Sequence, residues 1–175
     1  IGKRAAQLIH DGETVFLDAS TSSLHLARNI KEKKGLTVIT NAEKIVLELA
    51  DCENIRVICT GGLLHQKNMS YTGRIVEATI RSNYYANKVF FSCRGVTLGR
   101  GMMESSEAEA EIKRAMMECS ENAVLLCDKN KLGRLGVQVI GGVEKVDCMI
   151  TDIKLDEEWT AALSGQDVRL ITVEE

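Results

Sequence analysis

Short apolar runs alternate with stretches of helical spacing along the chain, and this alternation restricts the fold more than any other feature of the sequence. The apolar runs have the length of buried strands, and the stretches between them place apolar residues three or four positions apart, as on one face of a helix. Strands are therefore expected at residues 14–18, 36–40, 55–59, 88–92, 123–127, 147–151 and 168–173. Helices are expected at residues 22–33, 42–51, 74–81 and 106–120, with a short one near Trp159.

This order is typical of βαβ units, so the sequence predicts an α/β fold with a doubly wound, largely parallel sheet and helices on both faces. With 175 residues, a single domain spanning 1–175 is the simplest organisation. Open sheets of this kind bind ligands outside the carboxyl ends of their strands. The residues that directly follow each expected strand are therefore the first candidates for a site.

The charge balance argues against direct contact with nucleic acid. The net charge is −3, from 22 basic and 25 acidic residues, which is not the basic excess that phosphate contacts require. DNA binding is therefore expected only through a part of the protein outside this chain. No apolar run approaches the roughly 20 residues that span a bilayer, and the start lacks the apolar core of a secretion signal. A cytoplasmic protein without membrane partners is expected.

Neither a metal nor a cofactor is expected. The six cysteines form no Cys-x-x-Cys pair and are interpreted as reduced and structural. Cys59 and Cys127 lie within apolar strand patterns, where a free thiol behaves as a small hydrophobic group. The three histidines show no metal-ligand spacing, and the glycines on either side of Arg100 lack the third glycine of a dinucleotide-binding loop.

Four hydroxyl residues, 20–23, follow the first expected strand and stand just before a helix, with Asp18 at the end of the strand. The free N–H groups and the positive dipole end of a helix attract anions, and the hydroxyls of Ser20, Thr21 and Ser22 would add donors. The alternative is that Ser20 or Thr21 only caps the helix. The residues taken alone leave both interpretations open.

Candidates after the later strands each have an ordinary alternative. Asn41 follows the second strand and is also a common N-cap residue, whereas Gly62 forms a turn or lets backbone approach a ligand. Arg94 follows the fourth strand. Lys131 lies in a cation-rich segment after the fifth, which by composition alone favours a solvated loop. Their shared position after strands is what supports a site.

Seven segments together resemble the C-terminal effector-sensing domain of DeoR-type transcriptional repressors, in order and over nearly the whole chain. Residues 16–22 (FLDASTS) are similar to the family's FLDSGTT loop, and residues 37–41 (TVITN) to its TVVTN strand end. The other matches are Gly61-Gly62 with its GG turn, Gly73 with a later glycine, 109–116 (EAEIKRAM) with its EAEVKRAM helix, 128–133 (DKNKLG) with its DSSKFG loop, and 150–152 (ITD) with its ITD strand end. No single segment is specific to the family, but the set is.

The resemblance implies a fold shared with pentose-phosphate isomerases and a phosphorylated sugar as effector. It carries the family's phosphate loop over to Ser20, Thr21 and Ser22, with Asp18 beside them. It assigns the other pocket positions to Asn41, Gly62, Glu109, Lys113 and Lys131. It also implies a repressor that binds DNA through a winged helix-turn-helix absent from this chain, and assembly as a homodimer or homotetramer.

Two residues depart from the family pattern. Ser20 stands where the family often has glycine, which adds a hydroxyl but restricts the backbone. Arg94 stands where most members have aspartate, a residue that isomerase relatives use for proton transfer. A cation there removes a catalytic group and adds an anion contact, unless it points to solvent. This favours a binding protein over an isomerase, in which Glu109 and Lys113 would serve as base and partner rather than as a surface helix pair.

Overall fold

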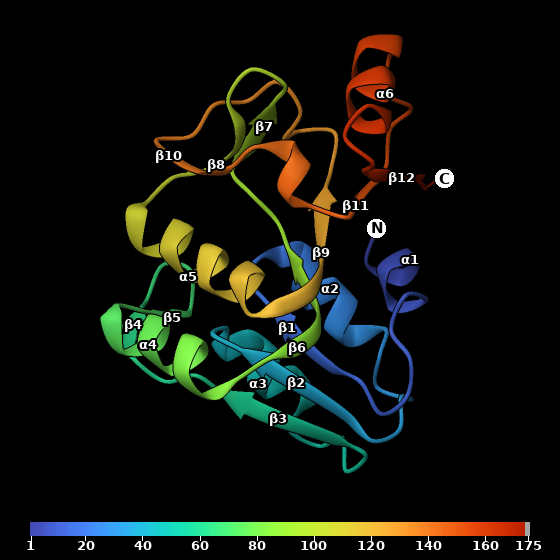
Figure 1. The fold of residues 1–175 in the computed structure, drawn as a ribbon. Coiled ribbons are helices and arrows are strands. Elements are labelled where there is room, and N and C mark those ends of the chain that lie inside the picture. Colours follow the sequence, from blue (N-terminus) through green and yellow to red (C-terminus); the bar gives the residue numbers. More distant parts are fainter. Residues whose placement is uncertain (174–175) are drawn as a thin grey trace.

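A seven-stranded sheet runs through the computed structural model, which describes residues 1–173 (Figure 1). Every neighbouring pair of its strands is parallel. In spatial order the strands are β12 (Arg169–Thr172), β11 (Cys148–Thr151), β9 (Ser120–Cys127), β6 (Ala86–Phe91), β1 (Thr14–Leu17), β2 (Leu36–Thr40) and β3 (Ile55–Cys59). The strand order changes direction at β1, so the connection after β1 leads to β2 on one side while β6 pairs on the other.

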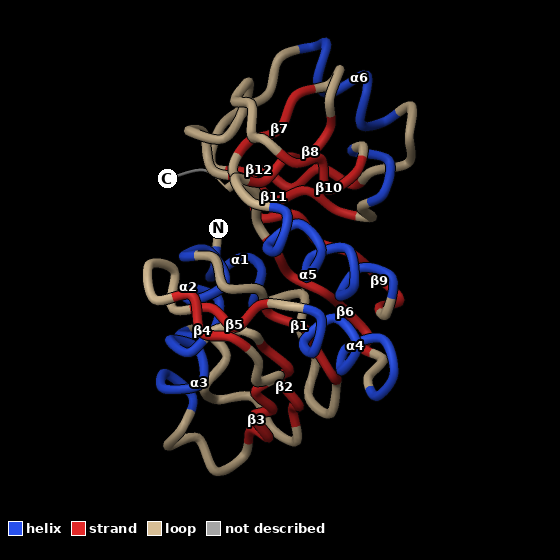
Figure 2. Tube along the Cα trace, turned by 90° about the vertical axis from the view of Figure 1, so that its left-hand side faces the viewer, coloured by secondary structure: helices blue, strands red, loops and turns tan. Residues whose placement is uncertain are grey.

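Helices cover both faces of the sheet (Figure 2). On one face lie α1 (Gly2–Ala6), α2 (Thr21–Arg28) and α3 (Glu43–Leu49); the core of the other face includes residues of α4 (Arg74–Asn83), α5 (Glu107–Glu118), the 3-10 helix η1 (Val143–Lys145) and α6 (Glu157–Ser164). The predicted α/β class and doubly wound parallel sheet are therefore confirmed.

The central strand β1 shows why an apolar run becomes a strand here. Phe16 packs into the core cluster on the α4–α5 face, and its neighbours Val15 and Leu17 pack into the cluster on the α1–α3 face. All three are fully buried. A parallel strand covered on both faces needs apolar residues at every position, which is what the sequence supplies.

Two small antiparallel units were not among the expected elements. One is a three-stranded sheet of β7 (Gly95–Thr97), β8 (Gly101–Glu104) and β10 (Gln138–Gly141), and the other is a hairpin of β4 (Leu63–His65) and β5 (Ser70–Thr72). Strands of three or four residues carry too little periodicity to be recognised. The glycine at position 101 lets β8 lie close to the end of β10. Its φ is +71°, and a Cβ there would lie 2.3 Å from the carbonyl oxygen of Gly141.

Several boundaries and one burial prediction differ from expectation. The helix expected at residues 22–33 is α2, which ends at Arg28, because the chain turns at Asn29 and buries Ile30 against the core. Cys59 was expected to be buried in its strand, but it is exposed, because β3 is an edge strand and Cys59 is its last residue. Cys127 is fully buried as expected.

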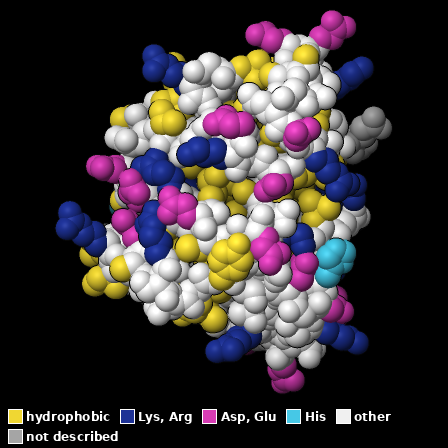
Figure 3. All heavy atoms as spheres, viewed as in Figure 1, with side chains coloured by type: hydrophobic (Ala, Val, Ile, Leu, Met, Phe, Trp, Pro, Cys, Tyr) yellow, Lys and Arg dark blue, Asp and Glu magenta, His cyan; other side chains and the backbone are white. Residues whose placement is uncertain are grey.

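Surface charge is mixed on the face seen in Figure 3, where Lys and Arg side chains are interspersed with Asp and Glu rather than gathered in one basic patch. Among residues 1–173, no helix is both long and apolar enough to cross a bilayer.

Candidate ligand-binding site

The loop after β1 is held together by the carboxylate of Asp18, which is almost fully buried. Its Oδ1 accepts hydrogen bonds from the Ser20 hydroxyl (2.6 Å), the Ser23 hydroxyl (2.6 Å) and the Ser20 N–H (3.2 Å). The Ser20 hydroxyl in turn accepts from the Ser23 N–H at 3.1 Å, so Ser20 is the N-cap of α2. The capping interpretation is therefore correct for Ser20, whose hydroxyl is used by the fold.

Thr21 and Ser22 begin α2 and remain available. Within residues 1–173, neither their backbone N–H groups nor their hydroxyls have a hydrogen-bond partner. The Thr21 side chain is exposed, and Ser22 is half-buried. Donors at the first turn of a helix lie at the positive end of its dipole, so this turn can hold an anion.

Lys113 lies under this loop, and the carboxylates of Asp18, Glu104 and Glu109 surround it. Its ammonium is 3.3 Å from Asp18 Oδ2 and forms a closer pair with Glu104, which ends β8. Burial alone would lower the pKa of Lys113, but the carboxylates of Asp18 and Glu104 outweigh it and raise this pKa. Burial likewise raises the pKa of Glu104, yet Lys113 outweighs burial and lowers it. Both groups are therefore charged at neutral pH.

The alternative interpretation of Glu109 and Lys113 as a surface helix pair is wrong, because both side chains are buried. Glu109 instead accepts hydrogen bonds at Oε1 from the Ser70 hydroxyl (2.5 Å) and the Asn68 amide (3.4 Å). These bonds attach the β4–β5 turn to α5. No residue within 1–173 donates to the other oxygen, Oε2.

Lys131 reaches back over the end of β6. Its ammonium donates to the Ser92 hydroxyl at 2.7 Å and to the Cys93 carbonyl at 3.1 Å, and Asp128 lies 3.8 Å away. The Ser92 N–H donates to Asp18 Oδ2 at 3.1 Å. The ends of β1, β6 and β9 are thus joined by one polar network, as the strand-end rule predicts.

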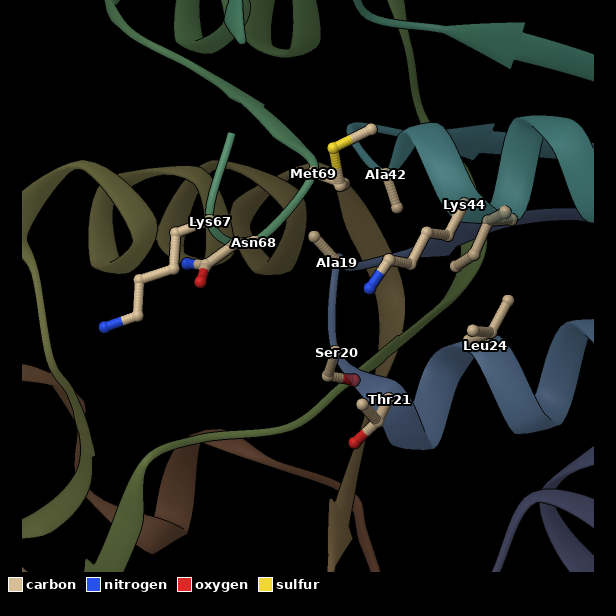
Figure 4. A pocket seen from close by; sticks show the side chains of 10 residues that line it. Ala19, Ser20, Thr21, Leu24, Ala42, Lys44, Lys67, Asn68 and Met69 are labelled. Carbon is tan, nitrogen blue, oxygen red and sulfur yellow. The ribbon is translucent and has the colours of Figure 1, made fainter. Parts of the chain in front are cut away.

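Two adjoining hollows open above this network and share four residues, Ala19, Ser20, Thr21 and Asn68. The first, of about 190 Å³, is lined towards α3 by Lys44, and Figure 4 shows its ammonium pointing towards the start of α2. The second has a volume of about 220 Å³. Its other lining residues are Ser92, Cys93, Arg94, Glu104, Ser105, Glu109, Lys113 and Lys131.

Of the ten residues predicted for the site, the structure brings six to the second hollow: Ser20, Thr21, Arg94, Glu109, Lys113 and Lys131. Asp18 lies beneath it and Ser22 is next to Thr21 in the first turn of α2. Their binding roles remain predictions.

Asn41 and Gly62 are not among the residues that line either hollow, and each has a structural role. Asn41 is fully buried. Its side-chain amide donates to the Tyr71 carbonyl (3.0 Å), and its backbone carbonyl accepts from the Tyr71 N–H (2.7 Å). Gly62 has a φ of +112°, and a Cβ there would lie 2.2 Å from a methyl carbon of Val76. Both residues fix the β4–β5 hairpin.

Glu104, Asn68 and Ser92 were missed by the sequence analysis. Ser92 directly follows β6, so the strand-end rule would have included it had the strand been ended one residue earlier. Glu104 and Asn68 belong to the two small antiparallel units, whose short strands carry no signal that points to a site.

The model of the DeoR C-terminal sensor domain family matches residues 1–153. The chain is 36% identical over 173 residues to the HTH-type transcriptional regulator YulB of Bacillus subtilis, covering 99% of this chain and 66% of that protein. It is 30% identical over 175 residues to the HTH-type transcriptional repressor GlcR of the same organism, covering 100% and 67%. The chain belongs to the DeoR sensor-domain family. It spans about two thirds of the length of these relatives.

Solved structures share the fold at low identity. Ribose 5-phosphate isomerase A of Methanocaldococcus jannaschii superposes with a TM-score of 0.53 at 14% identity, covering 75% of this chain and 51% of the isomerase. The eIF2B delta subunit of Chaetomium thermophilum gives 0.63 at 17% identity, covering 88% and 54%. The isomerase-like fold implied by the resemblance is confirmed.

Proposed function

We propose that this chain is the ligand-sensing part of a cytoplasmic transcriptional repressor of carbohydrate metabolism and that it binds a phosphorylated sugar. The observation that carries the proposal is the first turn of α2, where the N–H groups and hydroxyls of Thr21 and Ser22 have no partner within residues 1–173 and Thr21 lines both hollows. Partnerless donors at the positive end of a helix suit a phosphate group.

Lys131 completes the phosphate site in this proposal. Its ammonium is fixed by Ser92 and Cys93 and lines the same hollow as Thr21. A fixed ammonium and fixed N–H groups need little reordering on binding, so most of their interaction energy is available to the ligand.

The sugar hydroxyls would be recognised by Glu109 and Asn68. Glu109 Oε1 is occupied by Ser70 and Asn68, and Oε2 is left to accept from a hydroxyl in the hollow. A ligand hydroxyl that donates to Oε2 would form a hydrogen bond to a charged group, which strengthens the binding of a ligand that supplies one.

Binding without turnover is the function that the charges favour. Isomerisation of a sugar phosphate needs a base that is free to take a proton. Asp18 and Glu104 are both engaged by Lys113, and the lowered pKa of Glu104 makes it a weaker base. The alternative, an isomerase that uses Glu109, predicts turnover of a bound sugar phosphate.

The DNA-binding step would belong to a different part of the protein. Both relatives named above are HTH-type regulators that are longer than this chain, and the chain itself carries a net charge of −3. We propose that residues 1–175 form one sensing domain, and that ligand binding changes how the whole protein binds its operator.

The sensing domain would act as a homodimer or homotetramer. The edge strand β10 and the segment before it expose three apolar side chains within five residues, Leu135, Val137 and Val139. Exposed apolar residues at a sheet edge suit contact with a second copy, and light scattering after size-exclusion chromatography measures the assembly directly.

Thr21→Ala tests the phosphate site. A thermal-shift screen of phosphorylated sugars, each paired with its free sugar, should find a sugar phosphate that stabilises the wild type by about 2.7 kcal/mol at 100 times its Kd. The free sugar should give no shift. Thr21→Ala should weaken binding about tenfold or more, because a hydrogen bond to a charged group is lost.

Thr160→Ala is the matched control, since Thr160 is exposed on α6 and does not line either hollow. It should bind like the wild type. If no sugar phosphate shifts the transition, or if Thr21→Ala binds unchanged, the phosphate site is wrongly assigned. Conversion of the bound sugar phosphate into an isomer would favour the enzyme instead.

A further inference from the structure

Arg94 carries the one cationic side chain lining the second hollow that has no partner within residues 1–173. Its backbone is fixed by a 2.8 Å hydrogen bond from its N–H to the Met103 carbonyl, which holds it against β8. The side chain is exposed and lines the hollow, and its guanidinium forms no ion pair or hydrogen bond with the described residues.

The other two cations of this hollow already have roles. Lys113 is paired with Asp18 and Glu104, and Lys131, which the proposed function assigns to the phosphate, is held by Ser92 and Cys93. The second oxygen of Glu104 accepts from the N–H of the following residue, Ser105, at 2.8 Å. Arg94 is thus left to meet a charge that the ligand brings.

Arg94 and the phosphate donors come from different parts of the fold. Thr21 begins α2, beyond the end of β1, whereas Arg94 precedes β7 and lies beside the end of β8. The hollow thus has donors for an anion on the helix side and an unpaired guanidinium on the side of the small sheet, with the Glu109 carboxylate also in its lining.

We propose that the ligand carries a carboxylate in addition to its phosphate, and that Arg94 binds this carboxylate. The ligand class is then a phosphorylated sugar acid; this inference rests on the proposed function and narrows it. A planar guanidinium matches a carboxylate with two parallel hydrogen bonds. The unpaired guanidinium of Arg94 carries one positive charge, which one carboxylate matches, whereas a second phosphate brings about two negative charges.

The test compares ligand pairs that share a carbon chain and differ in the oxidation state of C1, an aldehyde or its cyclic hemiacetal in one and a carboxylate in the other. Erythrose 4-phosphate with 4-phosphoerythronate, ribose 5-phosphate with 5-phosphoribonate and glucose 6-phosphate with 6-phosphogluconate cover three chain lengths. Calorimetry on the wild type should give, for at least one pair, a Kd about tenfold or more lower for the acid. Arg94→Gln should weaken binding of the acid about tenfold more than binding of the sugar phosphate of the same pair, which removes this preference.

Arg100→Gln is the matched control, because Arg100 is an exposed arginine of the turn between β7 and β8 that does not line the hollow. It should keep the preference for the acid. The inference is overturned if Arg94→Gln keeps that preference, or if it weakens both members of a pair equally, since Arg94 would then bind the phosphate. Tighter binding of fructose 1,6-bisphosphate than of every acid would overturn it in favour of a second phosphate.

Failure of this inference is distinguishable from failure of the proposed function. If sugar phosphates bind, Thr21→Ala weakens them and no acid is preferred, only the carboxylate subsite is wrong. If no phosphorylated compound binds at all, both are wrong.

Discussion

The two ends of the seven-stranded sheet differ in how deeply their charged side chains are buried. At the carboxyl end, Asp18, Glu104, Glu109 and Lys113 are each 7% exposed or less. At the amino end a hollow of about 360 Å³ is larger than either hollow at the site, and its charged lining residues are exposed or half-buried. Those charged lining residues include Lys88, Asp147 and Arg169.

Burying ionised groups costs several kcal/mol each unless they are paired, and well-packed apolar residues often serve stability better. A fold that places four such side chains together under one helix terminus therefore bears a cost that stability does not explain. The hollow at the amino end is larger, but its charged lining residues are not buried in this way. The location of buried charge, rather than the size of a hollow, is what favours the carboxyl end as the proposed site.

Replacing Lys113 gives the largest expected effect. Lys113→Met should lower the free energy of unfolding by about 3–5 kcal/mol, because it leaves Asp18 and Glu104 buried without their counter-ion. Lys88→Met at the amino end removes an ion pair with Glu13 in which both side chains are 18% exposed, and should cost about 1 kcal/mol or less. Urea unfolding of both variants measures the difference. Equal losses of unfolding free energy in the two variants would show that the deeper burial at the carboxyl end makes no difference.

Removing one hydroxyl from the network should have an intermediate effect. Ser23 is fully buried and donates to Asp18 Oδ1 at 2.6 Å, so Ser23→Ala should cost about 1.5–3 kcal/mol, as expected for a bond to a charged group. Asn87→Ala is the counterpart at the amino end, where Asn87 Oδ1 accepts from the Thr14 N–H. This bond is between uncharged groups and should be worth about 0.5–1.5 kcal/mol. A larger loss for Asn87→Ala would contradict the comparison.

Acid sensitivity should give the smallest effect. Burial raises the pKa of Glu104 and also that of Glu13, but Lys113 and Lys88 respectively outweigh it, so both values are lowered. A carboxyl with a lowered pKa in the folded state stabilises the protein above its ordinary pKa of 4.5, and this contribution is lost as the pH falls below it. The drop in unfolding midpoint between pH 7 and pH 3.5 should therefore shrink in Glu104→Gln.

The same drop should shrink less in Glu13→Gln, because Glu13 is half-buried and its pair is better screened by solvent. Equal reductions in the two variants would show that burial at the carboxyl end adds nothing to the coupling.

The parts of the site that could be predicted from the sequence all lie next to strands of the main sheet. Thr21, Ser22 and Lys131 were found because each follows an apolar run long enough to be recognised as a strand. The cap at Ser20 could not be separated from a ligand contact by sequence, since the same hydroxyl serves either purpose. Only the bonds to Asp18 and to the Ser23 N–H decide it.

Two residues assigned by the resemblance do not line either hollow, and their binding roles stay predictions. Asn41 and Gly62 match family positions, yet in this structure they hold and pack the β4–β5 hairpin. A matching residue shows that a position is constrained. Whether the constraint comes from a ligand or from packing depends on neighbours such as Tyr71 and Val76, which lie far along the chain.

By itself the sequence determined the α/β class, the parallel sheet and a helix start within residues 20–22, because hydrophobic periodicity and strand ends are set by residues close together in the chain. The tertiary structure alone decided that Glu104 neutralises Lys113, that Asn68 and Glu109 meet, and that Arg94 has no partner within residues 1–173. These outcomes depend on short strands and on contacts between segments as many as 41 residues apart. Such contacts form only when the elements pack, and no local pattern records them.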